Sequence, residues 1–408
     1  MEKTLVYNIG MLATPKGFSA RRGKEQGAVE TLKDAWVLIE DGVITGVGCG
    51  ETDAPDAVRI DAEGRLVTPG LVDAHTHLVF GGWRQNELGM KLHGVSYLEI
   101  LAQGGGILST VRATRAASEA ELMEKARAAL EEMLRFGVTT CEIKSGYGLD
   151  TVTELKQLRV IRALDEEMDM DLVPTFLGAH AVAEEYKNDR EGYIRLLCED
   201  MIPAVAKSGL AKFCDVFCES GVFSAEESRR ILECGKAHGL RPKIHADEIK
   251  PIGGSQLTAE VGAISAEHLI VCPPEGIAAM AKAGTVACCL PATSFYLGST
   301  YAPVREMIES GVPVALASDF NPGSCPSLNL QFVINLGCLK YKMTPEEVLT
   351  AVTLNAAAAI DLSGRLGSVE VGKQGDLVIW DAPDLDYICY RMGSNLASSV
   401  IKKGKRLV

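Results

Sequence analysis

The sequence predicts an α/β fold: a (β/α)8 TIM barrel with a small β-sandwich domain formed by the N- and C-terminal segments. Two observations predict it. Eight short apolar segments alternate with helical stretches through the middle of the chain, and β-rich segments occur at both ends. Alternating strands and helices are typical of parallel βα units, and eight such units close a barrel. We therefore expect residues 65–364 to form the barrel, and residues 1–64 and 365–408 to form the sandwich.

The two ends of the chain share a β-rich composition. Residues 36–47 contain two β-rich runs on either side of Asp41-Gly42, a dipeptide typical of a tight hairpin turn. Residues 375–381 and 399–405 have the same character near the other end. We infer that the two termini build one small domain and that the barrel is inserted between them.

The eight candidate barrel strands are short apolar runs. They are residues 65–73, 138–143, 172–177, 213–217, 242–244, 263–266, 285–290 and 313–317. The helices between them have their own signals: Ser118 with Glu121 forms a capping box, and Pro345 stands at a first helical position. The glycine-rich segment 80–117 is long for a connection between a strand and a helix. Such connections usually build or cover the active site of a barrel, and we expect the same here.

Composition and charge exclude several classes of protein. The 408 residues carry a formal net charge of -13, whereas a nucleic-acid-binding protein should have a basic face. An anionic ligand would therefore need a local cationic group to hold it. We find no apolar run of membrane-spanning length and no secretory signal, and the twelve cysteines form no C-x-x-C pair. We expect a cytoplasmic protein with reduced thiols, and neither nucleic acid nor membrane as a partner.

Histidines gather at the ends of the candidate strands. Five of the seven histidines and one aspartate end or follow such a strand: His75, His77, His180, His245, His268 and Asp319. Strand ends meet on one face of a barrel, so these side chains should lie together. A His-x-His pair by itself is more often an ordinary pair of strand residues, but the shared placement of six residues favours a metal site. His238, late in a helix, receives no role, and the role of His93 stays open.

Imidazole and carboxylate ligands suit zinc or ferrous iron. His75 and His77 lie two residues apart on an extended chain, so both rings can face one ion. Such an ion lowers the pKa of water toward neutrality. Glu248, three residues after His245, could take the proton from that water and deliver it to a leaving nitrogen. The alternative for Glu248 is an exposed loop acid.

Several motifs resemble a known group of enzymes. Residues 69–77, Pro-Gly-Leu-Val-Asp-Ala-His-Thr-His, resemble the first-strand signature of the amidohydrolase superfamily. Within that superfamily, five further blocks resemble the imidazolonepropionase family: residues 104–107, 144–150, 176–180, 245–248 and 319–324. The resemblance covers nearly the whole chain, and the Lys-Ser-Gly-Tyr-Gly and Asp-Phe-Asn-Pro-Gly-Ser blocks are its most specific parts.

The resemblance implies a reaction and a set of site residues. The reaction is hydrolysis of 4-imidazolone-5-propanoate, a small anionic heterocycle, to N-formimidoyl-L-glutamate in histidine degradation, by metal-activated water with Glu248 as proton shuttle. The resemblance also implies one zinc or iron ion per subunit and a homodimer. The implied metal ligands are His75, His77, His245 and Asp319, and His268 would act in catalysis with Glu248. The implied substrate contacts are Arg84, Tyr97, Tyr147, His180, Asn321, Gly323 and Ser324.

The roles implied for Arg84 and His180 follow from the chemistry of their side chains, and Lys144 needs a separate interpretation. The guanidinium of Arg84 can bind a carboxylate through two parallel hydrogen bonds. His180 could donate a hydrogen bond to the ring carbonyl. Many relatives in the superfamily carry a carboxylated lysine between two metals on the fourth strand. Lys144 falls on the second candidate strand, so we predict one metal and a structural or pocket-lining role for this lysine.

Two other classes share parts of this pattern. An aminohydrolase that deaminates a ring such as cytosine or guanine would have the same metal site and Glu248, but it would not need Arg84. A non-catalytic scaffold with this fold would be expected to have lost metal ligands, whereas all four implied ligands are present in this chain.

Overall fold

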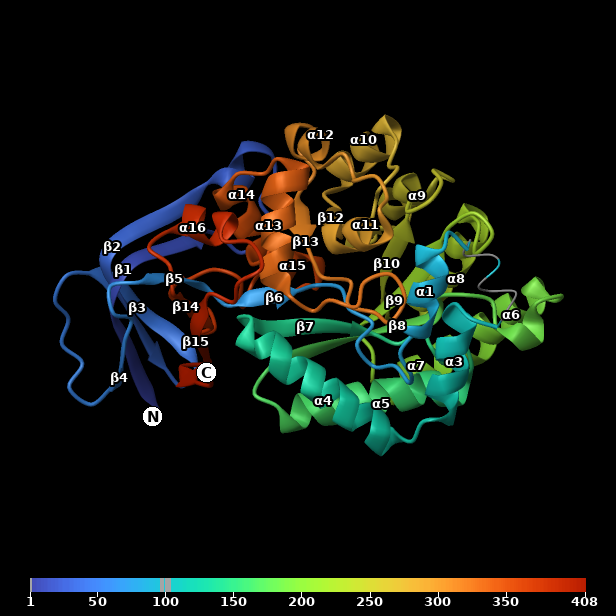
Figure 1. The fold of residues 1–408 in the computed structure, drawn as a ribbon, viewed down its shortest axis with the longest axis horizontal. Coiled ribbons are helices and arrows are strands. Elements are labelled where there is room, and N and C mark those ends of the chain that lie inside the picture. The colour runs from blue at the N-terminus through green and yellow to red at the C-terminus, as the bar shows by residue number, and fades with distance from the viewer. Residues whose placement is uncertain (1, 96–98, 100–103) are drawn as a thin grey trace.

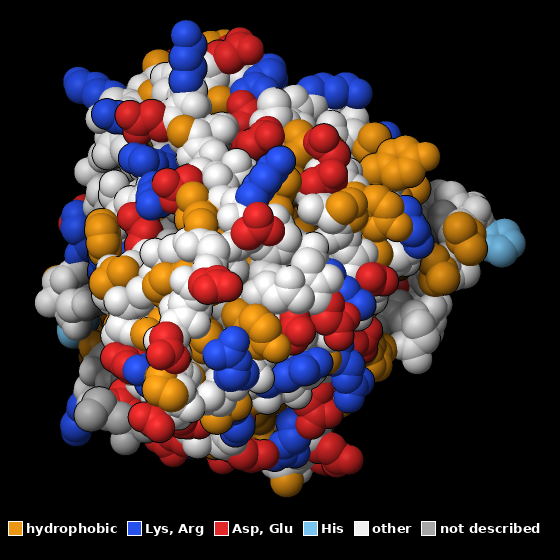
Figure 2. Space-filling model, turned by 90° about the vertical axis from the view of Figure 1, so that its left-hand side faces the viewer, with side chains coloured by type: hydrophobic (Ala, Val, Ile, Leu, Met, Phe, Trp, Pro, Cys, Tyr) orange, Lys and Arg blue, Asp and Glu red, His pale blue; other side chains and the backbone are white. Residues whose placement is uncertain are grey.

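The computed structural model describes residues 2–95, 99 and 104–408. These residues form two hydrogen-bonded sheets, which Figure 1 shows side by side. One sheet contains both ends of the chain, and the other is a barrel surrounded by helices. The predicted barrel with a small terminal β domain is confirmed. Figure 2 faces the terminal domain and shows acidic and basic side chains interspersed over its surface.

The terminal domain is built on one mixed sheet of eight strands. Its order is β16-β15-β14-β5-β1-β2-β3, and β4 also pairs with β1. The strands are β1 (Lys3–Pro15), β2 (Val29–Glu40), β3 (Val43–Cys49), β4 (Val58–Asp61), β5 (Leu66–Pro69), β14 (Leu377–Trp380), β15 (Ala397–Lys402) and β16 (Lys405–Arg406). They share one apolar core that includes Val6, Val37 and Ile401. The predicted hairpin is also confirmed: β2 and β3 meet at Asp41-Gly42, where both residues have positive φ, as a type I′ turn requires.

The first predicted barrel strand, residues 65–73, proves to be two strands in different sheets. Strand β5 pairs with β1 and β14 in the terminal sheet, whereas β6 (Leu71–Asp73) pairs with β7 in the barrel. The chain passes from one sheet to the other at Gly70, where a Cβ atom would lie 2.3 Å from the Thr139 hydroxyl oxygen. Hydrophobicity alone therefore did not distinguish these two strands, because both are apolar and they follow each other directly.

The barrel contains eight parallel strands in sequence order. They are β6, β7 (Val138–Lys144), β8 (Asp171–Ala179), β9 (Phe213–Cys218), β10 (Arg241–Ala246), β11 (Ser265–His268), β12 (Val286–Cys289) and β13 (Val314–Leu316). A parallel bridge between Thr76 and Phe320 joins the segments that follow the first and last strands. Its hydrogen bonds include His77 N–H to the Phe320 carbonyl at 2.9 Å and Asp319 N–H to the His75 carbonyl at 3.0 Å. The barrel therefore closes at the candidate metal ligands.

Helices cover the outside of the barrel and fill its connections (Figure 1). They are α1 (Asn86–Leu92), α3 (Ile107–Ala116), α4 (Glu119–Arg135), α5 (Thr151–Glu167), α6 (Arg190–Leu196), α7 (Ile202–Ser208), α8 (Ala225–Ala237), α9 (Gly254–Val261), α10 (Pro274–Ala283), α11 (Pro291–Leu297), α12 (Val304–Glu309), α13 (Leu330–Tyr341), α14 (Pro345–Ala351), α15 (Leu354–Ala359) and α16 (Leu385–Tyr390), with short helical turns η1 (Gly23–Gly27), η2 (Glu184–Tyr186) and η3 (Leu197–Met201). The predicted capping box of Ser118 and Glu121 is present at the start of α4. Within the described residues, no helix is both long and apolar enough to cross a bilayer.

Candidate metal centre

Three of the predicted ligands converge just beyond the ends of the first and last barrel strands. His75 Nε2 lies 3.2 Å from His77 Nε2, and each nitrogen lies 3.5 Å from Asp319 Oδ1. Metal bonds of about 2.0–2.1 Å in a tetrahedral arrangement place neighbouring ligand atoms about 3.4 Å apart. All three side chains are nearly inaccessible to water. The spacing therefore fits a zinc or ferrous ion at the centre of this group.

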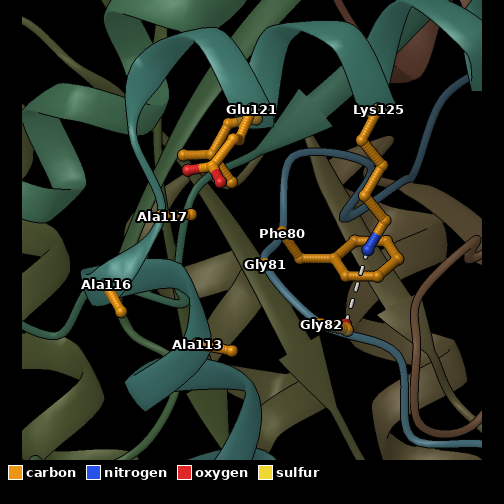
Figure 3. A pocket seen from close by; sticks show the side chains of 9 residues that line it. Phe80, Gly81, Gly82, Ala113, Ala116, Ala117, Glu121 and Lys125 are labelled. Atoms are coloured by element: carbon orange, nitrogen blue, oxygen red, sulfur yellow. Dashed lines mark hydrogen bonds between the residues drawn. The ribbon is translucent and has the colours of Figure 1, made fainter.

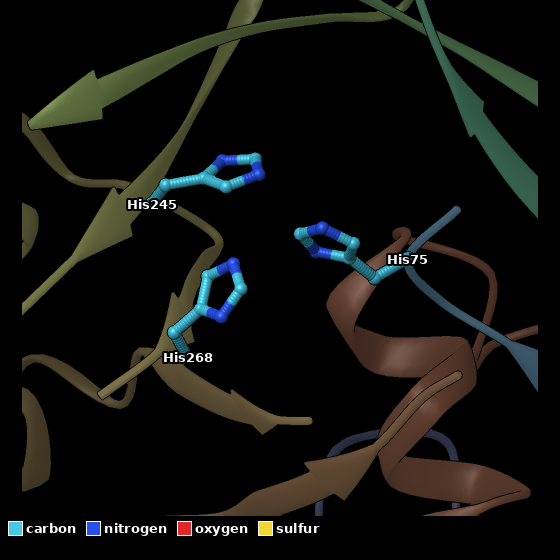
Figure 4. Close-up of side chains that lie close together, drawn as sticks. All are labelled: His75, His245 and His268. Atoms are coloured by element: carbon cyan, nitrogen blue, oxygen red, sulfur yellow. The ribbon is translucent and has the colours of Figure 1, made fainter. Parts of the chain in front are cut away.

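The fourth predicted ligand, His245, lies next to the other two histidines. Its ring centroid lies 4.7 Å from that of His75 and 5.5 Å from that of His77. The buried Nε2 atom of His245 has no hydrogen-bond partner among the described residues. Figure 4 shows the rings of His75, His245 and His268 around a common space, and one ring nitrogen from each lies within 4.8 Å of the others. A buried, unpartnered nitrogen facing other nitrogens is the arrangement that a cation would satisfy.

Two carboxylates fix the orientation of two predicted ligand histidines. Glu267 Oε2 lies 2.8 Å from His75 Nδ1, and Asp215 Oδ1 lies 3.1 Å from His245 Nδ1. Because a carboxylate accepts, each Nδ1 carries the hydrogen and each Nε2 keeps its lone pair for an ion. Burial lowers the pKa of His245, but the Asp215 carboxylate outweighs this effect and holds the pKa above its ordinary value. The imidazole is therefore a stronger base and gives its Nε2 lone pair more readily to a cation. The sequence analysis missed both carboxylates.

The predicted ligand Asp319 and the predicted catalytic residue His268 are held under backbone strain. Asp319 has φ of 57° and His268 has φ of 69°, values that side chains with a Cβ rarely adopt. Thr293 donates a hydrogen bond of 2.5 Å to Asp319 Oδ2, so Oδ1 faces the histidines. Burial raises the pKa of Asp319 to about 6 in the protein without an ion. Strained residues of this kind cluster at functional sites, where surrounding contacts hold them in place.

The two predicted catalytic residues lie next to each other at the rim of the metal centre. Glu248 Oε2 is 3.6 Å from His268 Nε2, and 15% of the Glu248 side chain is exposed, compared with 4% for His268. Burial, followed by the charge of Asp319, raises the pKa of Glu248 to about 8. A carboxyl group that titrates near neutral pH can both accept and donate a proton during turnover.

The raised pKa of Glu248 predicts how the stability of the metal-free protein depends on pH. Below about pH 4.5 this residue is protonated in both the folded and the unfolded chain. As the pH rises toward 8, only the unfolded chain ionises, so the free energy of unfolding falls. Relative to wild type, Glu248→Gln should raise the stability of the chelated protein at pH 8 by about 4 kcal/mol, with no gain at pH 4. Urea unfolding at both pH values measures this, and equal gains at the two would contradict it.

Tyr147 and His180 lie against the predicted metal ligands. The His180 ring stacks on His77 with centroids 4.9 Å apart, and the Tyr147 ring lies 5.3 Å from His180. His180 Nδ1 is 3.1 Å from the Gly146 carbonyl oxygen, which can only accept, so Nδ1 carries the hydrogen. Burial lowers the pKa of His180 to about 3, so the ring is neutral and Nε2 is an acceptor. In the neutral ring the backbone takes the donating nitrogen, so the predicted hydrogen bond from His180 to a substrate carbonyl would need a second hydrogen on Nε2 and stays a prediction.

Arg84 meets the predicted loop of Asn321, Gly323 and Ser324. A Cβ atom on Gly323 would lie 2.2 Å from Arg84 Nη1, so the guanidinium packs directly on this glycine. Asn321 Oδ1 accepts hydrogen bonds of 2.8 Å from the backbone N–H groups of Gly323 and Ser324, which fixes the turn. Glu87 orients Arg84 by accepting from Nε at 3.1–3.2 Å. The structure thus brings these four predicted substrate contacts together, whereas Tyr97 lies outside the described residues.

A cavity of about 340 Å³ lies beside the segment that carries Arg84 (Figure 3). The Lys125 ammonium lies 3.5 Å from the centroid of Phe80 and 4.6 Å from that of Trp83. Both aromatic rings also pack on Phe320, at 6.1 and 5.9 Å between centroids. Phe320 follows the candidate ligand Asp319, so this aromatic cluster supports the closing edge of the barrel from outside the metal centre.

The fold and the site define a class of protein, and comparison with known proteins agrees with it. Residues 66–407 match the amidohydrolase family, and the chain belongs to this family of metal-dependent hydrolases. It is 53% identical to the imidazolonepropionase of Alkaliphilus metalliredigens (strain QYMF), covering 100% of this chain and 98% of that protein. It is 52% identical to that of Streptococcus sanguinis (strain SK36), with 95% and 93% covered. Within the amidohydrolases, it is therefore a member of the imidazolonepropionase family, whose enzymes hydrolyse a cyclic amide.

Solved structures show the same fold at low sequence identity. A triazine hydrolase variant superposes with a TM-score of 0.77 at 18% identity, covering 100% of this chain and 94% of that one. The 5-methylcytosine deaminase of Klebsiella pneumoniae, liganded with phosphonocytosine, gives 0.75 at 17% identity, with 99% and 98% covered. The atrazine chlorohydrolase of Arthrobacter aurescens TC1, complexed with zinc, gives 0.73 at 18%, with 99% and 95% covered.

Proposed function

We propose that this enzyme hydrolyses 4-imidazolone-5-propanoate to N-formimidoyl-L-glutamate, with one zinc or iron ion per subunit. The ion would be held by His75, His77, His245 and Asp319. The observation that carries the proposal is the convergence of these residues at one end of the barrel, where the connection after β6 also places Arg84 against the loop of residues 321–324. The names of relatives that are about half identical over nearly the whole chain support the substrate.

Proton transfer is the task of Glu248. A bound zinc or iron ion would supply Lewis acidity, polarising the ring carbonyl and lowering the pKa of water. Glu248 accepts the proton of the attacking water and returns it to the ring nitrogen when the carbon–nitrogen bond breaks. His268, 3.6 Å from Glu248, would steady the attacking hydroxide or the tetrahedral oxyanion, and burial keeps the pKa of His268 far below its ordinary value. His268 is therefore neutral beside the developing charge.

The remaining polar groups orient the heterocycle. Because His180 Nε2 is an acceptor, it can receive a hydrogen bond from a ring N–H of the substrate. The Arg84 guanidinium can bind the propanoate carboxylate. Arg84 thus supplies the local positive charge that an anionic substrate needs on this acidic chain. The turn fixed by Asn321 places Gly323 against Arg84 and so limits how the guanidinium can move.

Replacing Arg84 with alanine tests the proposed carboxylate contact. We expect KM for 4-imidazolone-5-propanoate to rise about 10- to 100-fold, because a hydrogen bond to a charged group contributes about 1.5–3 kcal/mol. Metal content should stay at the wild-type value. Arg112→Ala is the control, since Arg112 is a half-exposed arginine on the nearby α3 that pairs with Glu184. An unchanged KM in Arg84→Ala would remove the basis for a substrate with an anionic tail.

The reaction itself can be followed by the ultraviolet absorbance of the substrate, with and without a chelator. Loss of absorbance that stops on chelation and returns with zinc or iron would support the proposal. Ammonia release from cytosine or guanine, with no turnover of the propanoate, would favour an aminohydrolase instead. A chain that binds no metal and turns over neither substrate would favour a scaffold.

Two further aspects of the proposal concern the state of the protein in the cell. We infer a cytoplasmic enzyme, which is supported by twelve cysteines that are all free of disulfide bonds. We also propose a homodimer that acts on a small anionic heterocycle and binds neither nucleic acid nor membrane. Sedimentation equilibrium of the purified enzyme tests the dimer, and a monomer at micromolar concentration would contradict it.

A further inference from the structure

The barrel interior beneath the metal ligands is filled by charged side chains, which we call the charged layer: Glu142, Lys144, Asp215, Lys243 and Glu267. Each of the five has an exposed fraction of 0%. They come from β7, β9, β10 and β11, and their ion pairs join strands that are not neighbours in the sheet, so the side chains point into the barrel. Barrel interiors are usually filled by bulky branched residues. Burying five charges here needs a reason other than packing.

One half of the charged layer begins at a ligand histidine. Asp215 uses one carboxylate oxygen, Oδ1, to hold His245 Nδ1 at 3.1 Å. Its other oxygen, Oδ2, accepts a hydrogen bond of 2.9 Å from the Lys144 ammonium. Lys144 also donates to Glu142 Oε1 at 2.8 Å. Lys144 and the Val216 N–H, which donates to Oδ1 at 2.8 Å, together hold Asp215 and with it the orientation of His245.

The other half repeats this arrangement at a second ligand. The Lys243 ammonium lies 3.5 Å from Glu142 Oε1 and 3.3 Å from Glu267 Oε1. Glu267 uses its other oxygen, Oε2, to hold His75 Nδ1 at 2.8 Å. The second oxygen of each orienting carboxylate thus faces a lysine: Asp215 accepts a hydrogen bond from Lys144, whereas Glu267 forms an ion pair with Lys243 and accepts its hydrogen bond from the Ser265 hydroxyl. Glu142 connects the two lysines. The five side chains form one continuous path between His75 and His245.

The charges of the layer also favour a cation at the metal position. Three carboxylates and two ammonium groups leave one net negative charge among side chains that are closed to solvent. Without the lysines, the three carboxylates would repel each other strongly in these low-dielectric surroundings. Although burial opposes it, Asp215 and Glu142 hold the pKa of Lys144 above its ordinary value, so its ammonium is charged. The lysines thus allow acids to lie close to the ligands while the layer keeps its attraction for a cation.

We propose that Lys144 and Lys243 are positioning residues of the metal centre, which hold Asp215 and Glu267 so that His245 and His75 each present Nε2 to the ion. The inference rests on the metal centre of the proposed function and extends it to two residues beneath the ligands. Of the two roles predicted for Lys144, structural or pocket-lining, the inference favours the structural one. Lys144 is fully buried and bonds to two carboxylates.

The test compares Lys144→Met and Lys243→Met with a matched control. Methionine keeps much of the length of lysine but carries no charge. Lys402→Met is the control, since Lys402 is also buried and paired with two carboxylates, at 2.8–2.9 Å, but joins the terminal sheet to the start of β8. Three quantities are measured: the Kd for zinc by chelator competition, the visible spectrum of the cobalt-substituted protein, and the thermal unfolding of the metal-free protein.

We expect each charged-layer variant to bind zinc about 10- to 100-fold more weakly than wild type, as is typical when the partners of ligand histidines are lost. The cobalt spectrum should also change, since it reports ligand geometry. Lys402→Met should lower thermal stability but leave the zinc affinity and the cobalt spectrum at wild-type values. Folded Lys144→Met and Lys243→Met proteins with wild-type affinity and spectrum would overturn this inference alone. A wild-type protein that binds neither zinc nor cobalt would overturn the proposed metal centre as well.

Glu142→Gln decides the question if the lysine variants fail to fold. Glutamine keeps the volume of Glu142 and its contact with Thr175, but it removes the charge that connects the two lysines. We expect at least a severalfold rise in the zinc Kd together with an altered cobalt spectrum. Wild-type values for both would overturn the proposal.

Discussion

His77→Ala should remove nearly all activity, by about 10³-fold or more in kcat/KM, together with the bound metal. Lewis-acid stabilisation is worth several kcal/mol, and each 1.4 kcal/mol is a factor of ten in rate. His77 is the most informative ligand to replace because its Nδ1 has no hydrogen-bond partner among the described residues. Its loss leaves the His75–Glu267 and His245–Asp215 pairs in place.

The measurement is metal content per chain together with steady-state kinetics. His238→Ala is the matched control, because His238 is exposed at the end of α8 and its side chain, among the described residues, bonds only to atoms of Cys234. The control should keep full metal content and activity. One tightly bound ion per chain and near-normal turnover in His77→Ala would show that His77 is not a ligand.

Glu248→Gln should lower kcat about 10²- to 10⁴-fold while metal content stays at the wild-type value. The amide cannot accept the proton of the attacking water, and general acid–base catalysis contributes a factor of this size. Because Glu248 is three residues beyond His245 and contacts His268 rather than the predicted ligands, the metal centre should persist. Stopped-flow and steady-state rates, with metal analysis of the same samples, measure the effect.

Glu248→Asp is the companion variant, since it keeps the carboxyl group but withdraws it by one methylene. We expect partial activity between the wild-type and glutamine values. A kcat within a few-fold of wild type in Glu248→Gln would assign proton transfer to another group. His268 would then be the next candidate, because its ring nitrogen lies 3.6 Å from Glu248.

The local pattern of the sequence was enough to predict most of the barrel. Parallel strands fully covered by helices are continuous apolar runs, and capping boxes such as Ser118 with Glu121 show where helices begin. The gathering of His75, His245 and Asp319 also followed, because residues at strand ends meet on one face whatever their separation along the chain. The boundary between β5 and β6 was not predicted, because both strands lie in one apolar run. They are distinguished by pairing alone: β5 pairs in the terminal sheet and β6 pairs in the barrel.

The charged layer could not be predicted in the same way. Glu142 and Lys144 alternate with apolar residues in β7, a pattern that is also typical of a strand with one face in water. The closure of the barrel turns that face inward, where the acids meet lysines from other strands. One feature of the sequence could have indicated a buried charge. Lys243 lies two residues before His245 on β10, so both side chains point to the same, inward face.

The sequence by itself determined which residues stand at the ends of the barrel strands, and therefore which side chains can reach a common ion. The tertiary structure alone decided the hydrogen-bonding state of those side chains. Gly146 makes His180 an acceptor, and Asp215 and Glu267 turn Nε2 of His245 and His75 toward the ion. The physical reason is that the position of a ring hydrogen depends on the partner across the barrel, and that partner is chosen by packing rather than by neighbours in the chain.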